Sequence, residues 1–223
     1  MTRFIIHKEG TTSVFIAVMF GFAAIYAAWV LLSAVWLSVF LTIVFGLLML
    51  WVVFFFRVPR LVVKAQPGDV LSSADGKVVA VEQIDMEHFP GGKAWQVSVF
   101  MSPFNTHLNR FPVPGRIESV SYEKGKFLPA YHPKSSDLNE RNTVRMISDQ
   151  GDVIWIRQIA GIMARRIVNY ARKNQQVYAG EPLGFIKFGS RVDHFLPAYA
   201  TVNVKIGQNV RAGKTILAVL LKD

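Results

Sequence analysis

The sequence predicts a mainly β (α+β) protein: a barrel-sandwich β domain with one helix, preceded by a transmembrane helical hairpin. The prediction rests on a long uncharged apolar run near the amino end, a series of short β-type runs divided by glycine turns, and one segment with helical spacing. The 223 residues allow one domain of ordinary size beside the apolar run. The chain has no cysteine, which excludes disulfide scaffolds, thiolate zinc sites and cysteine nucleophiles.

The amino-terminal run is apolar enough to belong in lipid. Glu9 and Arg57 are consecutive charges, and the 47 positions between them hold no Asp, Glu, Lys or Arg. Because a helix rises about 1.5 Å per residue and the hydrocarbon core is about 30 Å thick, residues 14–56 are long enough for two passes. We expect an anchoring hairpin at 14–56, between a cytoplasmic tail at 1–13 and a basic linker at 57–66. One tilted span with a buried extension is the alternative.

Aromatic residues mark the middle of this run. Tyr26, Trp29 and Trp36 lie where a hairpin would reach the far interface, a depth that aromatic rings favour; packing between the helices is the other interpretation. Both flanks of the run are positive, so two passes place both flanks in the cytoplasm. A cleaved signal peptide fits poorly, because the run is far longer than a short signal-peptide core. We therefore expect an inner-membrane protein whose remainder, residues 67–223, faces the cytoplasm.

The remainder reads as a β domain with one helix. Glycine turns, among them Asp75-Gly76 and Pro90-Gly91-Gly92, separate strand-like runs at 77–81, 95–100, 116–122, 143–147 and 153–158. The spacing of these runs suits a sandwich or a partly closed barrel. We expect the helix at 162–172, where Ile167 and Ala171 lie four positions apart.

Two stretches of the β domain have a similar sequence pattern. VKIGQNVRAGKTILAVL, within the two strands expected at 200–221, resembles half of a lipoyl or biotinyl carrier domain, and PGDVLSSADGKVVAVE is similar to it. The pair predicts two interlocked, lipoyl-like β halves. Carrier domains attach their prosthetic group to a lysine in a particular sequence context. No lysine of this chain has that context, so carrier function is disfavoured.

The β domain is basic. Residues 57–223 hold 23 Lys and Arg against 14 Asp and Glu, a surplus of nine positive charges next to a membrane anchor. Anionic lipid headgroups are the nearest counter-charge. Nucleic acid is not an expected partner, because the sequence has no basic helix, no RNA-binding aromatic strand and no Cys/His finger.

Four stretches in a fixed order carry a family resemblance. They are SSADGKV around Asp75, FMSPFNTHLNRFPVPGRI around His107, IRQIAGIMARRIV, and GFIKFGSRVDHFLP around Gly189-Ser190. Together they resemble the phosphatidylserine decarboxylases, in their short, membrane-anchored prokaryotic form. The resemblance covers nearly the whole chain, including the apolar amino end that runs into FFFRVPR.

The resemblance implies a proenzyme that cuts itself between Gly189 and Ser190 and converts Ser190 into a pyruvoyl cofactor. The cut chains, 1–189 and 190–223, would remain together as a heterodimer. The residue types suit this chemistry, because a serine hydroxyl can attack the preceding carbonyl and glycine tolerates the backbone distortion. No pyridoxal phosphate is implied. Scattered histidines without metal-binding spacing also give no reason to expect a metal.

The same resemblance assigns roles to Asp75 and His107. Imidazole can accept a proton from Ser190 and later deliver one to the substrate, and Asp75 would orient the imidazole or help to move the proton. The family's longer members have a second histidine where this chain has Arg110, and an acid where it has Asn105. The base for cleavage therefore stays open between His107 and another group, and Asp75 could also be an ordinary turn residue.

The implied reaction is decarboxylation of phosphatidylserine, drawn from the membrane, to phosphatidylethanolamine. Arg110, Arg141 and Arg191 are candidates for binding the lipid phosphate, because a guanidinium matches two phosphate oxygens. Two alternatives remain: decarboxylation of the ether lipid archaetidylserine, and a non-enzymatic, membrane-tethered lipoyl-like adaptor. A homo-oligomer is left open.

Overall fold

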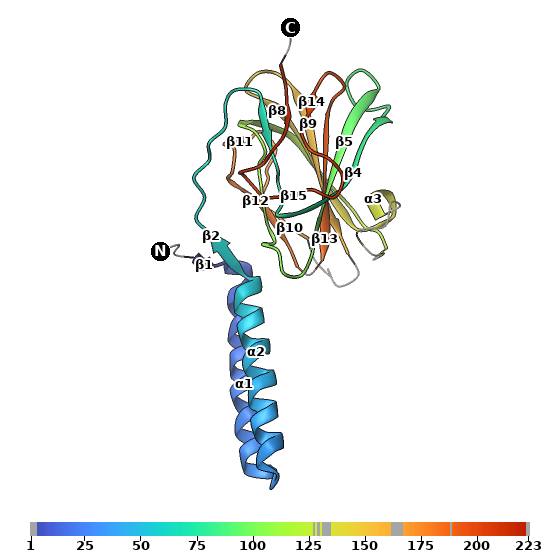
Figure 1. The fold of residues 1–223 in the computed structure, drawn as a ribbon. Coiled ribbons are helices and arrows are strands. Elements are labelled where there is room, and N and C mark those ends of the chain that lie inside the picture. Colours follow the sequence, from blue (N-terminus) through green and yellow to red (C-terminus); the bar gives the residue numbers. More distant parts are fainter. Residues whose placement is uncertain are drawn as a thin grey trace. The chain divides into compact units, whose positions relative to one another are not determined.

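The computed structural model describes residues 4–126, 128, 130, 135–161, 167–187 and 189–221. Two compact units make up the chain, Met1–Arg60 and Leu61–Asp223 (Figure 1).

Two apolar helices form most of the first unit and run side by side (Figure 1). The backbone between them is extended at Leu32 and Ala34, which ends one helix and starts the next. The prediction of two apolar helices is therefore confirmed. Short strands on either side of the helices pair antiparallel, Ile5 opposite Val58. The elements are β1 (Phe4–Ile6), the 3-10 turn η1 (Lys8–Gly10), α1 (Thr11–Leu31), α2 (Val35–Phe55) and β2 (Arg57–Pro59).

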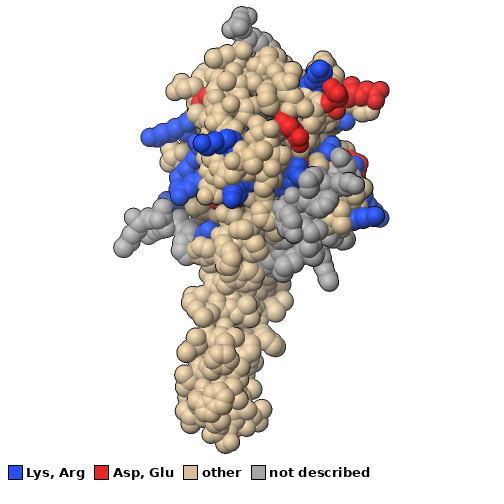
Figure 2. Space-filling model, turned by 45° about the vertical axis from the view of Figure 1, so that its right-hand side comes forward, with Lys and Arg blue, Asp and Glu red and all other residues tan. Residues whose placement is uncertain are grey.

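Two side-chain hydrogen bonds join the helices of the hairpin. Ser38 Oγ donates to the Ala28 carbonyl at 3.0 Å, and Trp29 Nε1 donates to Thr42 Oγ1 at 3.0 Å. Such pairing matters in lipid, which offers no hydrogen-bond partners. On the face shown in Figure 2 the helices carry no charged side chains. Each helix has 21 residues, about 30 Å at 1.5 Å per residue, so both are compatible with a membrane anchor.

The aromatic side chains near the hairpin tip do not pack between the helices. Tyr26 is 72% exposed, Trp36 is 73% exposed and Trp29 is 51% exposed. Outward-facing rings at this level suit the interpretation that they lie at a membrane interface.

An antiparallel, curled sheet of eight strands dominates the second unit (Figure 1). All five predicted strand runs lie within it and are confirmed. The strands, in sheet order, are β11 (Gln176–Val177), β7 (Gly115–Glu123), β8 (Arg141–Ser148), β9 (Val153–Ala160), β13 (Ser190–Pro197), β5 (Lys93–Met101), β4 (Gly76–Asp85) and β15 (Asn209–Val210).

Two small sheets and a single helical turn complete this unit. The turn is α3 (Ser135–Leu138). One sheet has the order β10 (Ile167–Asn169), β12 (Pro182–Ile186) and β6 (Leu108–Arg110). The other has the order β14 (Thr201–Val202), β16 (Ile216–Val219) and β3 (Asp69–Leu71).

The helix predicted at 162–172 is wrong in the part that the structure describes. Residues 162–166 lie outside the described residues, and Ile167–Asn169 form strand β10. Ile167 pairs with Ile186, and Val168 pairs with Phe185. The β-branched side chains suit this pairing, so tertiary contacts decided a segment whose local pattern also fitted a helix.

The carboxyl-terminal part forms three short strands where two were predicted. The two stretches of similar sequence pattern pair with each other, because β16 lies beside β3 and β15 lies beside β4. The chain turns at Gly207 and Gly213, both with φ above +60°, which shortens the individual strands.

Strand β13 occupies the middle of the large sheet and is buried over its whole length. It pairs with β5 on one side and β9 on the other. Val192 and Leu196 point from it into the main hydrophobic core. A residue at the start of this strand is therefore held by neighbours on both sides.

Candidate active site

Ser190 is the first residue of β13. Its backbone lies opposite Met101 at the end of β5 and opposite Ala160 at the end of β9. Its Oγ is buried and makes no hydrogen bond within the described part of the chain. A buried hydroxyl without a partner costs about 1–3 kcal/mol, so this group calls for an explanation.

Gly189 has the backbone conformation that glycine tolerates best. Its φ is +66°, in the left-handed region, whereas a Cβ added there would meet nothing within 4 Å. The need for glycine is thus conformational and not a matter of space. Its N–H donates to His107 Nε2 at 3.3 Å, which ties the residue before Ser190 to the imidazole.

His107 is buried at the end of the loop between β5 and β6. Its Nδ1 lies 3.0 Å from the Asn105 carbonyl oxygen, which can only accept. The hydrogen-bond network therefore assigns the proton to Nδ1, and Nε2 remains the acceptor that faces Gly189. Asn105, where the resemblance had marked a departure, shapes this loop, since its Oδ1 accepts from both the N–H and the hydroxyl of Ser102.

Asp75 lies at the same end of the sheet as Ser190. Lys77 pairs with Phe100, and Met101 pairs with Ser190, so β5 separates Asp75 from Ser190. At the usual strand spacing the two backbones are about 10 Å apart. The Asp75 carboxylate accepts from the Ala212 N–H at 2.7 Å and so holds a carboxyl-terminal turn.

His194 joins the loop that contains Asp75 to strand β13. Its Nε2 accepts from the Ser73 N–H at 3.0 Å, and its Nδ1–H donates to the Val97 carbonyl at 3.2 Å. Complete burial lowers the pKa of His194 to about 4, against the opposing effects of the Val97 bond and the Asp193 charge. The imidazole is therefore neutral, with both nitrogens occupied. Motif reasoning did not single it out, although residues 190, 192 and 194 share one face of the strand.

The three candidate phosphate ligands lie on different strands. Arg110 Nη1 donates to the Gly180 carbonyl at 2.7 Å, and burial lowers the pKa of Arg110 against the opposing charge of Asp75. Arg141 begins β8 at the same sheet end as Ser190 and forms an ion pair with Glu123.

Arg191 faces away from the Ser190 side chain, because successive residues of a strand point to opposite faces. Its Nε donates to Asp193 Oδ1 at 2.6 Å and its Nη2 donates to Ser98 Oγ at 2.7 Å. Asp193 also accepts from Ser136 Oγ at 2.7 Å. This buried ion pair therefore fastens the start of β13 from the other face of the sheet.

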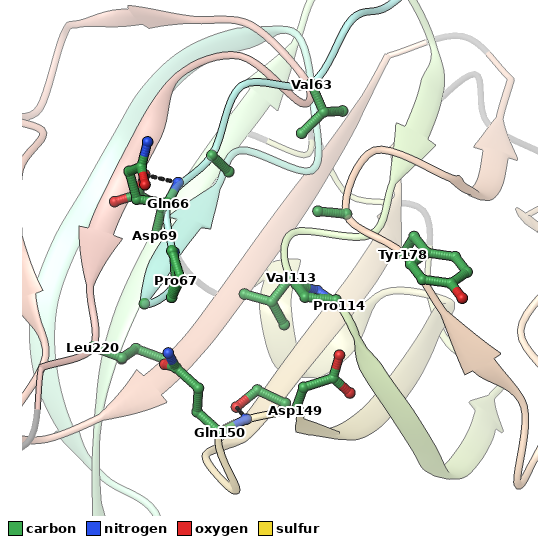
Figure 3. Close-up of a pocket in the computed structure, with 14 residues that line it drawn as sticks. Val63, Gln66, Pro67, Asp69, Val113, Pro114, Asp149, Gln150, Tyr178 and Leu220 are labelled. Atoms are coloured by element: carbon green, nitrogen blue, oxygen red, sulfur yellow. Dashed lines mark hydrogen bonds between the residues drawn. The ribbon is translucent and has the colours of Figure 1, made fainter.

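Two cavities of the β unit lie away from this constellation. The first, of about 450 Å³, is drawn in Figure 3. It is lined by the β8–β9 turn, which lies at the opposite end of these strands from Ser190. Its lining includes Pro67, Asp69, Pro114, Asp149, Gln150 and Tyr178. The second, of about 710 Å³, is lined by Arg157, Arg191 and Phe195 on the other face of β13. Among the described residues, no three His, Asp or Glu side chains gather as a metal site would require.

The structure thus brings His107, Gly189 and Ser190 together, places Asp75 two strands away, and separates the three arginines. The candidate site therefore lies at the start of a central, buried strand of the large sheet.

Comparison with known proteins gives the family. The model of the phosphatidylserine decarboxylase family matches residues 48–218. A phosphatidylserine decarboxylase proenzyme of Amoebophilus asiaticus is 42% identical over 98% of this chain and 97% of the relative, and one of Cytophaga hutchinsonii is 42% identical over 96% and 97%. A proenzyme of Burkholderia lata is 46% identical over 79% of this chain and 82% of the relative. The chain belongs to the phosphatidylserine decarboxylase family.

Proposed function

We propose that this protein decarboxylates phosphatidylserine to phosphatidylethanolamine, after cutting itself between Gly189 and Ser190 and converting Ser190 into a pyruvoyl group. Membership of the family and the proenzyme names of its relatives support the proposal. The observation that carries it is the buried hydroxyl of Ser190, which has no hydrogen-bond partner among the described residues and follows a glycine whose N–H is bonded to His107.

Self-cleavage follows from the groups at this strand end. Ser190 Oγ attacks the Gly189 carbonyl carbon, the C–N bond between the two residues breaks, and an ester and a free amine at position 190 result. Loss of the α-proton of residue 190 then expels the Gly189 carboxylate and leaves dehydroalanine. Tautomerisation and reaction with water release ammonia and leave the pyruvoyl group.

His107 is the proposed proton carrier. Its Nε2 is an acceptor at Gly189, next to the bond that breaks. The backbone carbonyl of Asn105 keeps this nitrogen unprotonated by accepting a hydrogen bond from Nδ1–H. A neutral imidazole can take the proton of Ser190 and, during turnover, return one to the carbon that has lost carbon dioxide.

Position 190 fits a pyruvoyl group. Its side chain is buried and not engaged by a hydrogen bond within the described chain, and its backbone is fixed by two strands. The pyruvoyl ketone would supply an electron sink for the substrate's amino-bearing carbon. Asp75 would act on this end of the site through its charge, which also acts on Arg110.

The remaining parts of the chain would bring the site to its substrate. The helical hairpin would anchor residues 67–223 at the cytoplasmic face of the inner membrane, and the basic surface would favour anionic lipid. Arg110 and Arg141 are the proposed phosphate ligands; Arg191 joins them only if its bond to Asp193 opens. Pairing of β3 with β16 and of β4 with β15 supports a lipoyl-like arrangement of the two β halves.

Ser190→Ala tests the proposal, because alanine lacks the attacking oxygen. The wild-type chain should yield a fragment of 34 residues, 190–223. Intact mass spectrometry should show this fragment lighter, by one ammonia, than plain hydrolysis would give. Ser190→Ala should stay in one piece and release no carbon dioxide from phosphatidylserine vesicles.

Ser148→Ala is the matched control, since Ser148 is also a buried serine but lies at the far end of β8. It should be cut and active. Normal decarboxylation by an uncut Ser190→Ala chain would refute the proposed function.

A further inference from the structure

Gly161 lies against the carbonyl group that self-cleavage would attack. It follows β9 directly and is buried. A Cβ placed on Gly161 would lie 2.3 Å from the Gly189 carbonyl oxygen and 3.1 Å from its carbonyl carbon. Atoms that are not bonded do not approach so closely. The Gly189 carbonyl therefore fits in its place only because residue 161 is a glycine.

Hydrogen bonds and strand pairing hold the backbone on both sides of this contact. On one side, Gly189 N–H is bonded to His107 and Ser190 is paired with β5 and β9. On the other side, the residue before Gly161 is held twice, since Ala160 N–H donates to the Glu140 carbonyl and the Ala160 carbonyl accepts from Asn139 Nδ2 at 2.8 Å. A side chain at position 161 would therefore turn the Gly189 carbonyl away and not merely shift a flexible neighbour.

Gly161 and Gly189 are glycines for different reasons. Gly189 needs a positive φ and has open space, whereas Gly161 has no room for a Cβ and shows no left-handed φ. Glycine is thus required at position 161 because the Gly189 carbonyl occupies the place that a Cβ would take.

We propose that Gly161 is a positioning residue for self-cleavage: it holds open the space in which the Gly189 carbonyl faces Ser190 and in which the oxygen moves as its carbon becomes tetrahedral. This inference rests on the proposed function. Reaction geometry is sensitive to displacements of about 1 Å, which cost on the order of 100-fold in rate. One added methyl group at 161 forces a displacement of that size.

The test is Gly161→Ala in the full chain, with the fraction cut followed over time by gel electrophoresis. Cleavage should slow by about 10- to 100-fold, so that uncut chain accumulates. Because hydroxylamine splits esters and spares amides, the uncut chain should resist hydroxylamine, which shows that the block precedes ester formation. Its melting temperature should be lowered about as much as that of the control variant Gly115→Ala, so that any difference in cleavage reflects the position of the clash and not its effect on stability.

Gly115→Ala is the matched control. A Cβ there would lie 2.2 Å from the Ile147 carbonyl oxygen, an equal backbone clash at the far end of β8. It should lower the melting temperature yet leave cleavage complete. If Gly161→Ala folds poorly, adding Ala130→Gly should restore part of the cleavage, because the Ala130 Cβ lies 3.3 Å from the added atom.

Wild-type cleavage in Gly161→Ala, or equally slow cleavage in Gly115→Ala, would overturn the inference while leaving the proposed function intact. An active but uncut Ser190→Ala chain would instead overturn the proposed function, so the two failures are distinguishable.

Discussion

The buried polar side chains near the start of β13 differ in how completely they are hydrogen-bonded. His194 has a partner on each nitrogen, and Asp193 binds both Arg191 and Ser136. Ser190 Oγ, equally buried, has no partner among the described residues. His107 lies between these cases, because one nitrogen is fixed and the other only accepts an amide proton. At this strand end the residues with complete hydrogen bonding are therefore different from those to which we assign the proposed reaction.

The neutral state of His194 makes the fold sensitive to acid. Its folded pKa of about 4 is below the ordinary value of 6.5, so the unfolded chain binds the proton first as the pH falls. Its contribution to stability should be complete above pH 6.5 and decline between pH 6.5 and 4, by about 3 kcal/mol in all. Urea unfolding of the detergent-solubilised chain at several pH values measures this.

His194→Gln is the comparison, since glutamine does not titrate. Other groups contribute equally to both chains, so the difference in unfolding free energy between them should change with pH across this window. Identical pH dependence in the two chains would contradict the assignment.

At the scale of elements, β13 combines the proposed cleavage site with the strongest local support in the sheet. All eight of its residues are buried, and both its edges are paired. Ser190 is the first residue of both pairings, so breaking the bond before it leaves the pairing of residues 191–197 in place. A strand of this kind can begin a new chain without leaving the sheet.

The fragments 1–189 and 190–223 should therefore migrate together in size-exclusion chromatography and separate only when urea unfolds the sheet. Asp193→Ala should lower the urea concentration at which they separate. The substitution leaves the Arg191 guanidinium buried without the Asp193 carboxylate, and such a loss lowers the free energy of unfolding by about 3–5 kcal/mol.

Glu123→Ala is the control at the same end of the sheet, because its ion pair with Arg141 is partly exposed. Exposed pairs contribute about 0–1 kcal/mol, so separation should hardly change. Fragments that part in native buffer would contradict the expectation.

The whole molecule divides its tasks between two units. The first carries a run of 47 uncharged positions, and the second carries most of the charge. This separation fits the proposed function, in which the first unit would anchor the chain in the bilayer and the second would carry out the chemistry.

Because the chain has no cysteine, single-cysteine variants can report its orientation without background. Ser33→Cys lies between the two helices and Gln150→Cys lies on the β8–β9 turn, both exposed. In intact cells a membrane-impermeant maleimide should label Ser33→Cys but not Gln150→Cys. After permeabilisation it should label both variants. Labelling of Gln150→Cys in intact cells would place the β unit on the other side.

The sequence by itself determined the local features of this protein. The uncharged run determined two helices, β-type runs between glycine turns determined the main strands, and the ordered motifs pointed to His107 and Ser190. These depend on hydropathy, on turn-forming residues and on side-chain chemistry, all of which are read from neighbouring positions.

Only the tertiary structure decided which groups meet. Strand register brought His107 to Gly189, turned Arg191 to the opposite face and set Gly161 against the Gly189 carbonyl. It also made Ile167–Asn169 a strand, although the local spacing fitted a helix. The physical reason is that pairing joins residues far apart in the chain, and a shift of one residue would reverse every side chain.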